Sequence, residues 1–356
     1  MSHLFEPFQL KSIALRNRVG VSPMCEYSAE DGMPNDWHLV HLGSRAIGGA
    51  GLVIAEATGV SPEARITPGD TGIWADRHIE PFARITRFLK AHGAVAGIQI
   101  AHAGRKASAA VPWEGGDHLP DDAGGWIPVA PSAIAFGDGL DKVPHALTVE
   151  EIKRVQADFV AAARRSLAAG FEWLELHSAH GYLSHEFLSP LSNQRTDNYG
   201  GAFENRIRFL LETTRAVRAV WPEKLPLTVR ISCTDWVEGG WDLEQSVELA
   251  RRLRAEGVDL IDCSSGGAVP NAKIAVGPGY QVPFAERIRR EAGIATAAVG
   301  LITEAKQADD IVRSGQADVV LLAREFLRDP YWPAHAARAL GQAAALPAPN
   351  QYARAW

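Results

Sequence analysis

Two histidines and a tyrosine lie close together in the segment 175–183, which reads Glu-Leu-His-Ser-Ala-His-Gly-Tyr-Leu. His177 and His180 are three residues apart, so their imidazoles can donate two N–H groups to one oxygen atom. Tyr182 carries a phenol that can deliver a proton nearby. An oxygen clamp beside a proton donor is typical of an enzyme active site, and we predict one here.

Other roles for histidine pairs remain open from the sequence. The two histidines of the segment could instead bind zinc, and His185 and Glu186 follow them, but no third ligand stands at a firm spacing. We therefore favour the oxygen clamp and expect no metal. A second pair, His38 and His41, lies on a predicted helix and is interpreted as structural.

A helix, a glycine and a short strand precede the two histidines. Thr148 and Glu151 form a capping box that predicts the start of an amphipathic helix. Gly170 ends this helix and leaves 171–176 as an apolar strand. The active-site residues therefore follow the carboxyl end of a strand, where α/β barrels place their chemistry.

The same pattern recurs along the chain. The expected strands are 18–22, 52–55, 95–100, 171–176, 225–231, 258–262, 295–299 and 317–322, each followed by a helical pattern such as 243–256 after the cap Asp242. Strands that alternate with helices in this way predict a single (β/α)8 TIM barrel. An open doubly wound sheet is the alternative.

Two segments depart from a minimal barrel. Residues 8–18 predict a small N-terminal hairpin that closes the bottom of the barrel. Residues 103–147 follow the third strand and are rich in Gly, Pro and Trp, which favours a capping loop or lid. We expect one domain over residues 1–356.

The other strand ends carry further candidates. They include Ser22-Pro23-Met24-Cys25 with Tyr27, then Ala57, Gln99, Arg230, Gly267, Gly300, Ala323 and Arg324. Backbone N–H groups after the last strands of a barrel form a phosphate-binding cradle. We place Gly267, Gly300, Ala323 and Arg324 in it.

Composition narrows the class of protein. The chain has 356 residues, of which 46% are hydrophobic, and a formal net charge of −6, which argues against a nucleic-acid or anionic-membrane partner. We see no signal peptide and no membrane span. Three widely spaced cysteines favour a reducing compartment, so we expect a cytoplasmic protein.

The motifs together resemble the Old Yellow Enzyme family of flavin-dependent ene-reductases over essentially the whole chain. The resemblance rests on Ser22-Pro23-Met24-Cys25, on the segment 177–183, on 193–206 and on Arg324 to Pro330. Cys25 with Tyr27 is similar to the thermophilic-like branch, which includes xenobiotic reductase A. Ala323 departs from the family, which usually has glycine there.

The resemblance implies a bound FMN and NADPH or NADH as the reductant. FMN-binding residues would be Ser22, Pro23, Met24, Cys25, Ala57, Gln99, His177, Arg230, Gly267, Gly300, Ala323 and Arg324. Substrate contacts would come from Tyr27, His177, His180, Tyr182, Arg354 and Trp356, with Tyr182 and the two histidines in catalysis. Cys25 would tune the flavin.

The expected reaction is reduction of the activated C=C bond of α,β-unsaturated carbonyls by a ping-pong mechanism. Reduction of nitro compounds or other xenobiotics, or a dehydrogenase reaction, is the alternative on the same flavin barrel. A cofactor-free lyase or a metal-dependent hydrolase, and a non-enzymatic binding protein, are the alternatives from other classes.

The last residues, 345–356, predict an interface. Aromatic side chains and arginine anchor protein contacts, and the tail ends in Tyr352, Arg354 and Trp356. In the branch that the chain resembles, a C-terminal arginine reaches the neighbouring subunit's active site. We therefore expect a homodimer or homotetramer in which Arg354 and Trp356 border the partner's pocket near Tyr27.

Overall fold

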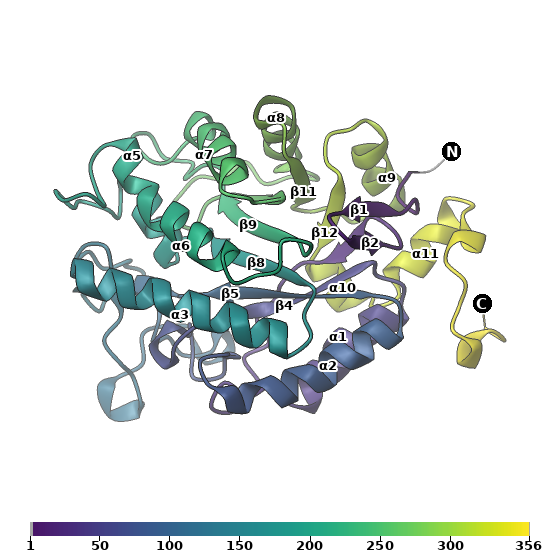
Figure 1. Cartoon of the computed structure of the whole chain (residues 1–356), viewed down its shortest axis with the longest axis horizontal. Helices are drawn as coiled ribbons and strands as arrows, with labels where there is room; N and C mark the ends of the chain where they lie inside the picture. Colours follow the sequence, from purple (N-terminus) through teal and green to yellow (C-terminus); the bar gives the residue numbers. More distant parts are fainter. Residues whose placement is uncertain (1–2, 356) are drawn as a thin grey trace.

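A closed barrel of parallel strands forms the centre of the computed structural model, which describes residues 3–355 (Figure 1). Its strands are β3 (Val19–Val21), β4 (Leu52–Gly59), β5 (Val95–Ala101), β8 (Trp173–Ser178), β9 (Leu227–Ser232), β10 (Leu260–Ser264), β11 (Ala295–Val299) and β12 (Val319–Leu322). They follow one another around the barrel in chain order, and β12 closes it by pairing with β3. The predicted TIM barrel is confirmed, and the open sheet is wrong.

Several strand bounds differ from those expected. The strands expected to start at 171, 225, 258 and 317 each begin two residues later, and the strand expected at 52–55 continues to Gly59. Two of the late starts have a visible cause, because Asp259 and Asp318 use their carboxylates to accept the N–H groups of Leu227 and Thr296 on neighbouring strands. The strand expected at 171–176 also ends two residues later, at Ser178, so His177 lies inside β8.

Helices cover the outside of the barrel (Figure 1). They are α1 (Asp36–Ile47), α2 (Ile79–Ala91), α3 (Val149–Ala168), α6 (Arg208–Arg218), α7 (Leu243–Ala255), α8 (Val282–Ala292) and α9 (Ala305–Arg313), with α10 (Arg324–Arg328) and α11 (Trp332–Ala339) after β12. The predicted caps at Thr148 and Asp242 are confirmed. Two short helices that were not predicted, α4 (Leu183–Leu188) and α5 (Phe203–Arg206), stand between β8 and α6.

The predicted N-terminal hairpin is present. Strands β1 (Phe8–Leu10) and β2 (Ile13–Leu15) pair antiparallel. Their apolar side chains pack against a cluster inside the barrel that includes Leu52, Trp173 and Leu321. Because this packing fills the amino-terminal end of the barrel, the other end is left for the site.

The segment 103–147 lies over the barrel with little regular structure. It holds three short 3₁₀ turns and a two-residue pairing of β6 (Val129–Ala130) with β7 (His145–Ala146). Arg105 anchors it, because its guanidinium donates to the carbonyl of Ala268 at 2.6 Å and its backbone N–H donates to Glu186 Oε1 at 2.8 Å. Among residues 3–355, we find no helix with the length and apolar character that a bilayer crossing requires.

Candidate active site

His177 lies near the carboxyl end of β8 with 4% of its surface exposed. Its Nδ1 accepts a hydrogen bond from the backbone N–H of Ala179 at 3.2 Å, which leaves the imidazole proton on Nε2. Burial, followed by the charge of Arg230, lowers the pKa of His177 well below its ordinary value. The side chain is therefore a neutral hydrogen-bond donor.

His180 faces His177, with 5.2 Å between the ring centroids and 82° between the ring planes. Its φ of 60° lies in the left-handed region, and its backbone N–H donates to Ser232 Oγ at 2.9 Å. Its Nε2 lies 2.7 Å from Ser264 Oγ. Burial lowers the pKa of His180 as well, so the structure brings together two neutral imidazoles.

Tyr182 completes this group from the position just before α4. Its ring centroid lies 5.1 Å from that of His177, with the planes at 80°. Burial, with smaller effects of Cys25 and Tyr27, raises the pKa of Tyr182 well above its ordinary value. The phenol therefore keeps its proton at neutral pH and can serve as a proton donor.

Close backbone contacts hold the loops after β8 and β10 together. Gly181 has a φ of 72°, and a Cβ there would lie 2.0 Å from the carbonyl oxygen of Gly267. A Cβ on Gly267 would lie 2.5 Å from Cα of His180. Lys106 spans the same junction and donates from Nζ to the carbonyls of His180 at 2.8 Å and Gly267 at 2.7 Å. Only glycine fits at both positions.

The residues after β3 form a neighbouring wall. Ser22 is buried, and its Oγ has no hydrogen-bond partner among residues 3–355. The thiol of Cys25 lies beside the backbone of Ala57 and the phenol of Tyr27. Burial raises the pKa of Cys25 well above its ordinary value, so this residue is a thiol and not a nucleophilic thiolate.

A buried charged layer lies inside the barrel beneath these groups. Gln99 donates from Nε2 to Glu175 Oε1 at 2.8 Å, and Arg230 Nε lies 3.0 Å from Asp262 Oδ2. Burial raises the pKa of Glu175 to about 8 and also raises that of Asp262. Because burial and the nearby charge of Asp262 both raise the pKa of Glu175, its carboxyl group holds a proton at neutral pH.

This proton makes a pH-dependent contribution to stability. The pKa of Glu175 is about 8 in the folded chain and about 4.3 when the chain is unfolded. The raised value means that the contribution is complete below the unfolded pKa and is lost as the pH rises through the folded one. We expect the melting temperature of the flavin-free wild type to fall between roughly pH 5 and pH 8 relative to that of Glu175→Gln, whose amide cannot ionise. Parallel melting curves across this pH range would contradict a protonated Glu175.

A cavity of about 160 Å³ joins β9 to β12 at the same end of the barrel. Its walls include Gly300, Ala323 and Arg324, which were predicted in one phosphate cradle, and Arg230, which was predicted as a separate FMN contact. Gly300 has a φ of 122°, and a Cβ there would lie 2.9 Å from Gln281 Nε2. Gly267 is not part of this wall, because it lies against His180.

The C-terminal tail lies elsewhere. Figure 1 shows it beside α11, away from the segment 103–147. The ring of Tyr352 lies 6.1 Å from that of Tyr331, and Arg354 is exposed. Trp356 lies outside the described residues. The predicted contact of the tail with an active site therefore needs a second subunit.

Some residues of the site were not predicted. Lys106, Asp262 and Gln281 were missed, although Lys106 follows the third strand closely in the sequence and Asp262 ends an expected strand. Gln281 donates to the carbonyl of Val299 at 2.9 Å and accepts from Ser265 Oγ at 2.6 Å, which ties two strand ends together. The structural role predicted for His38 and His41 agrees with their contacts to Glu56 at 3.6 Å and Glu26 at 3.3 Å.

Comparison with known proteins assigns the barrel. Residues 3–342 match the NADH:flavin oxidoreductase / NADH oxidase family. The chain belongs to this family. Its members bind FMN, so this barrel is an FMN-dependent oxidoreductase. No cluster of three or more His, Cys, Asp or Glu side chains that could hold a metal occurs among residues 3–355.

Relatives of the flavin oxidoreductase cover its full length. The chain is 50% identical to an NADPH dehydrogenase of Bacillus velezensis over 355 residues, or 99% of each chain. It is 49% identical to an NADPH dehydrogenase of Listeria monocytogenes over 358 residues, or all of both chains. These relatives confirm the predicted NAD(P)H-dependent enzyme class.

Solved structures agree. Morphinone reductase in complex with tetrahydroNAD superposes with a TM-score of 0.79 at 30% identity, over 99% of this chain and 94% of that one. An old yellow enzyme homologue from Zymomonas mobilis gives a TM-score of 0.77 at 28% identity, over 97% and 94%. The predicted resemblance to the Old Yellow Enzyme family is confirmed.

The residues present fit an FMN. The cavity has one guanidinium at β9 and another after β12, so it can receive the polar edge of a flavin ring and a phosphate. The buried hydroxyl of Ser22 supplies a polar group that the described residues leave without a partner.

Proposed function

We propose that this flavin oxidoreductase uses NADPH or NADH to reduce the activated C=C bond of α,β-unsaturated carbonyls and related electrophilic alkenes. The observation that carries the proposal is the pair of buried neutral imidazoles beside a protonated phenol. Neutral donors suit a carbonyl oxygen that becomes negative during the reaction, and the phenol suits a carbon that must gain a proton.

The proposed cofactor site uses residues of three regions. Arg230, Gln99 and Ala57 would contact the polar edge of the flavin ring, with Ser22 to Cys25 beside it. The backbone around Gly300, Ala323 and Arg324 would hold the phosphate, while Gly267 would support His180. When bound, FMN supplies the hydride.

The chain's own residues perform the remaining steps. His177 and His180 donate to the substrate's carbonyl oxygen, and these hydrogen bonds strengthen as charge grows there. Tyr182 gives its proton to the α-carbon. Tyr27 and Cys25 line the substrate and flavin side of the pocket, and the thiol of Cys25 tunes the flavin without forming a bond to it. Because reductant and alkene would share one pocket, the kinetics would be ping-pong.

The proposal is tested on the purified protein. We expect it to be yellow, to release FMN on denaturation, and to convert 2-cyclohexenone to cyclohexanone with one NADPH consumed per ketone formed. Double-reciprocal plots should be parallel. Recovery of FAD, or NADPH oxidation without a saturated product, would contradict the proposed activity.

We also propose that the protein is a homodimer or homotetramer in which Arg354 and Trp356 border the partner's substrate pocket near Tyr27. The exposed Arg354 in a tail that stands away from its own lid supports this arrangement. Deleting residues 351–356 should raise the substrate KM several-fold and leave FMN bound. Light scattering should show a smaller assembly. An unchanged mass and unchanged kinetics would exclude an interface role.

A further inference from the structure

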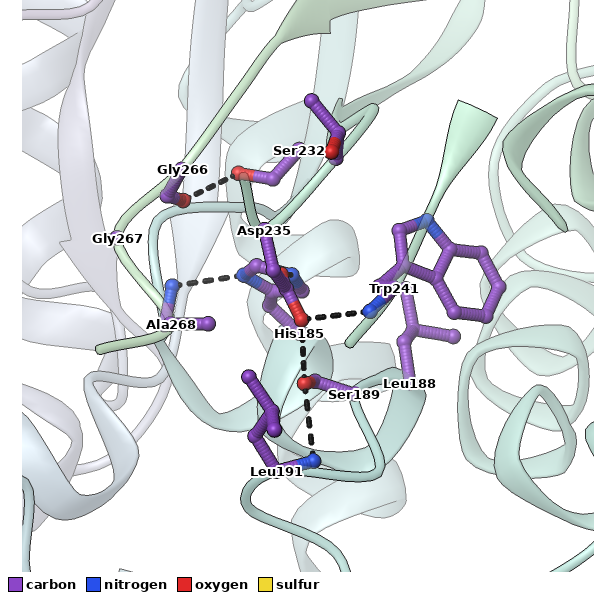
Figure 2. Close-up of polar contacts among 12 residues, drawn as sticks. His185, Leu188, Ser189, Leu191, Ser232, Asp235, Trp241, Gly266, Gly267 and Ala268 are labelled. Atoms are coloured by element: carbon purple, nitrogen blue, oxygen red, sulfur yellow. Dashed lines mark hydrogen bonds and ion pairs between the residues drawn. The ribbon is translucent and has the colours of Figure 1, made fainter. Parts of the chain in front are cut away.

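A buried histidine and carboxylate in contact stand behind the catalytic loop, and the proposed mechanism does not use them. His185 lies in α4 and Asp235 in the loop after β9, and both side chains are fully buried. His185 Nε2 lies 2.9 Å from Asp235 Oδ1. Figure 2 shows the two side chains together, with Ser189 and Trp241 around the carboxylate. A buried charge of this kind requires an explanation, because burial alone is costly.

The hydrogen bonds of the pair fix its protonation. His185 Nδ1 accepts from the backbone N–H of Gly181 at 2.8 Å, so the imidazole proton is on Nε2, which faces Asp235. Asp235 Oδ2 accepts from Ser189 Oγ at 2.6 Å and from the N–H of Trp241 at 2.7 Å. Burial raises the pKa of Asp235, but His185 and these two donors outweigh it and hold the pKa below its ordinary value. The pair is thus a carboxylate that orients a neutral imidazole.

The group that this imidazole holds is the peptide between His180 and Gly181. Its N–H donates to His185 at 2.8 Å, and its carbonyl accepts from Lys106 Nζ, also at 2.8 Å. The peptide is therefore gripped on both edges. It joins two consecutive residues in the left-handed region, His180 at φ 60° and Gly181 at φ 72°. That conformation is unfavourable for a residue with a Cβ and needs outside contacts to persist.

We propose that Asp235 and His185 are positioning residues, which clamp the His180–Gly181 peptide so that the imidazole of His180 and the phenol of Tyr182 converge on one substrate. The effect on substrate binding rests on the proposed function. The clamping of the peptide rests only on the contacts described above. His180 precedes the clamped peptide and Tyr182 follows it, so rotation of this one peptide displaces both side chains. A displacement of about 1 Å can cost on the order of 100-fold in rate.

Two isosteric variants separate the clamp from general stability. His185→Asn and His185→Leu both remove the contact with Asp235, but the asparagine Oδ1 can take the place of Nδ1 and accept from Gly181. The first readout is amide hydrogen exchange of the peptides that cover residues 175–187. The second is the Kd of the holoenzyme for 4-hydroxybenzaldehyde, a phenol that the two histidines would bind. FMN content and melting temperature are recorded for each variant.

We expect His185→Leu to speed exchange around Gly181 and to weaken phenol binding on the order of 10- to 100-fold with FMN still bound. His185→Asn should lie between His185→Leu and the wild type in both properties, because it keeps an acceptor for Gly181 and loses the contact with Asp235. Equal losses in the two variants would show that the pair only stabilises the fold and would overturn the proposal. Faster exchange with unchanged phenol affinity would overturn the positioning role alone.

A further variant and a control complete the test. Asp235→Asn keeps the imidazole and decides the question if neither His185 variant folds, because unchanged exchange and unchanged phenol affinity in it would overturn the role of Asp235. His78→Leu is the matched control, since His78 is also buried and accepts the N–H of Ala75 at 3.1 Å. It should leave exchange around Gly181 unaltered. If the wild type neither binds the phenol nor reduces enones, the proposed function is wrong, and the exchange data still decide the clamp.

Discussion

Tyr182→Phe should slow the half-reaction that consumes an enone by about 10²- to 10⁴-fold, the usual contribution of a positioned general acid. The half-reaction with NADPH needs no proton from this phenol, so its rate should stay within a few-fold of the wild-type rate. We expect the loss in the enone half-reaction because the raised pKa of Tyr182 keeps its proton available for the substrate at neutral pH. The loss of one hydroxyl leaves the ring contact with His177, 5.1 Å away, in place.

Stopped-flow absorbance of the flavin measures the two half-reactions separately. Tyr199→Phe is a suitable control, because the hydroxyl of Tyr199 donates to Glu212 at 2.8 Å and takes no part in the proposed reaction. Its two rates should match those of the wild type. If Tyr182→Phe slows both half-reactions by the same factor, the phenol only packs against His177 and does not donate the proton.

Arg230→Met should have the largest effect on stability. It removes the guanidinium that pairs with the carboxylate of Asp262, whose side chain is fully buried. Removing one partner of a buried ion pair costs about 3–5 kcal/mol of unfolding free energy. FMN should also bind much more weakly, because the cavity loses its guanidinium at β9. Denaturant unfolding of the flavin-free protein and FMN titration measure the two effects.

Two further variants identify the cause of this loss. Adding Asp262→Asn to Arg230→Met removes the unpaired carboxylate and should restore much of the stability but not FMN affinity. Arg252→Met breaks a pair with Glu248 that is 45% and 36% exposed, and it should cost at most about 1 kcal/mol. An Arg230→Met protein as stable as Arg252→Met would show that Asp262 is not ionised in the fold.

The sequence predicted local features well and long-range contacts poorly. The caps at Thr148 and Asp242 depend on residues three positions apart, so they were visible before folding. The bounds of β8 were not, because pairing with β5 and β9 decides where a barrel strand begins and ends. The later end moved His177 from a loop into a strand.

The same distinction holds in the site. The grouping of His177, His180 and Tyr182 follows from their spacing in one segment. Lys106 was missed because its partners are backbone carbonyls of two other loops. Such partners cannot be identified from residue types in the sequence. His185 was considered only as a zinc ligand, since its partner Asp235 lies on the loop of another strand.

The β1–β2 hairpin closes one end of the barrel and leaves the other end open. Its apolar packing fills the amino-terminal end, so we expect FMN to enter through the end over which the segment 103–147 lies. Hydrogen bonds from Lys106 and Arg105 connect that segment to the loops after β8 and β10. Opening of this segment should then limit cofactor binding. At high FMN concentration, the rate of FMN uptake by the flavin-free chain should equal the rate at which the segment opens and should no longer depend on the FMN concentration.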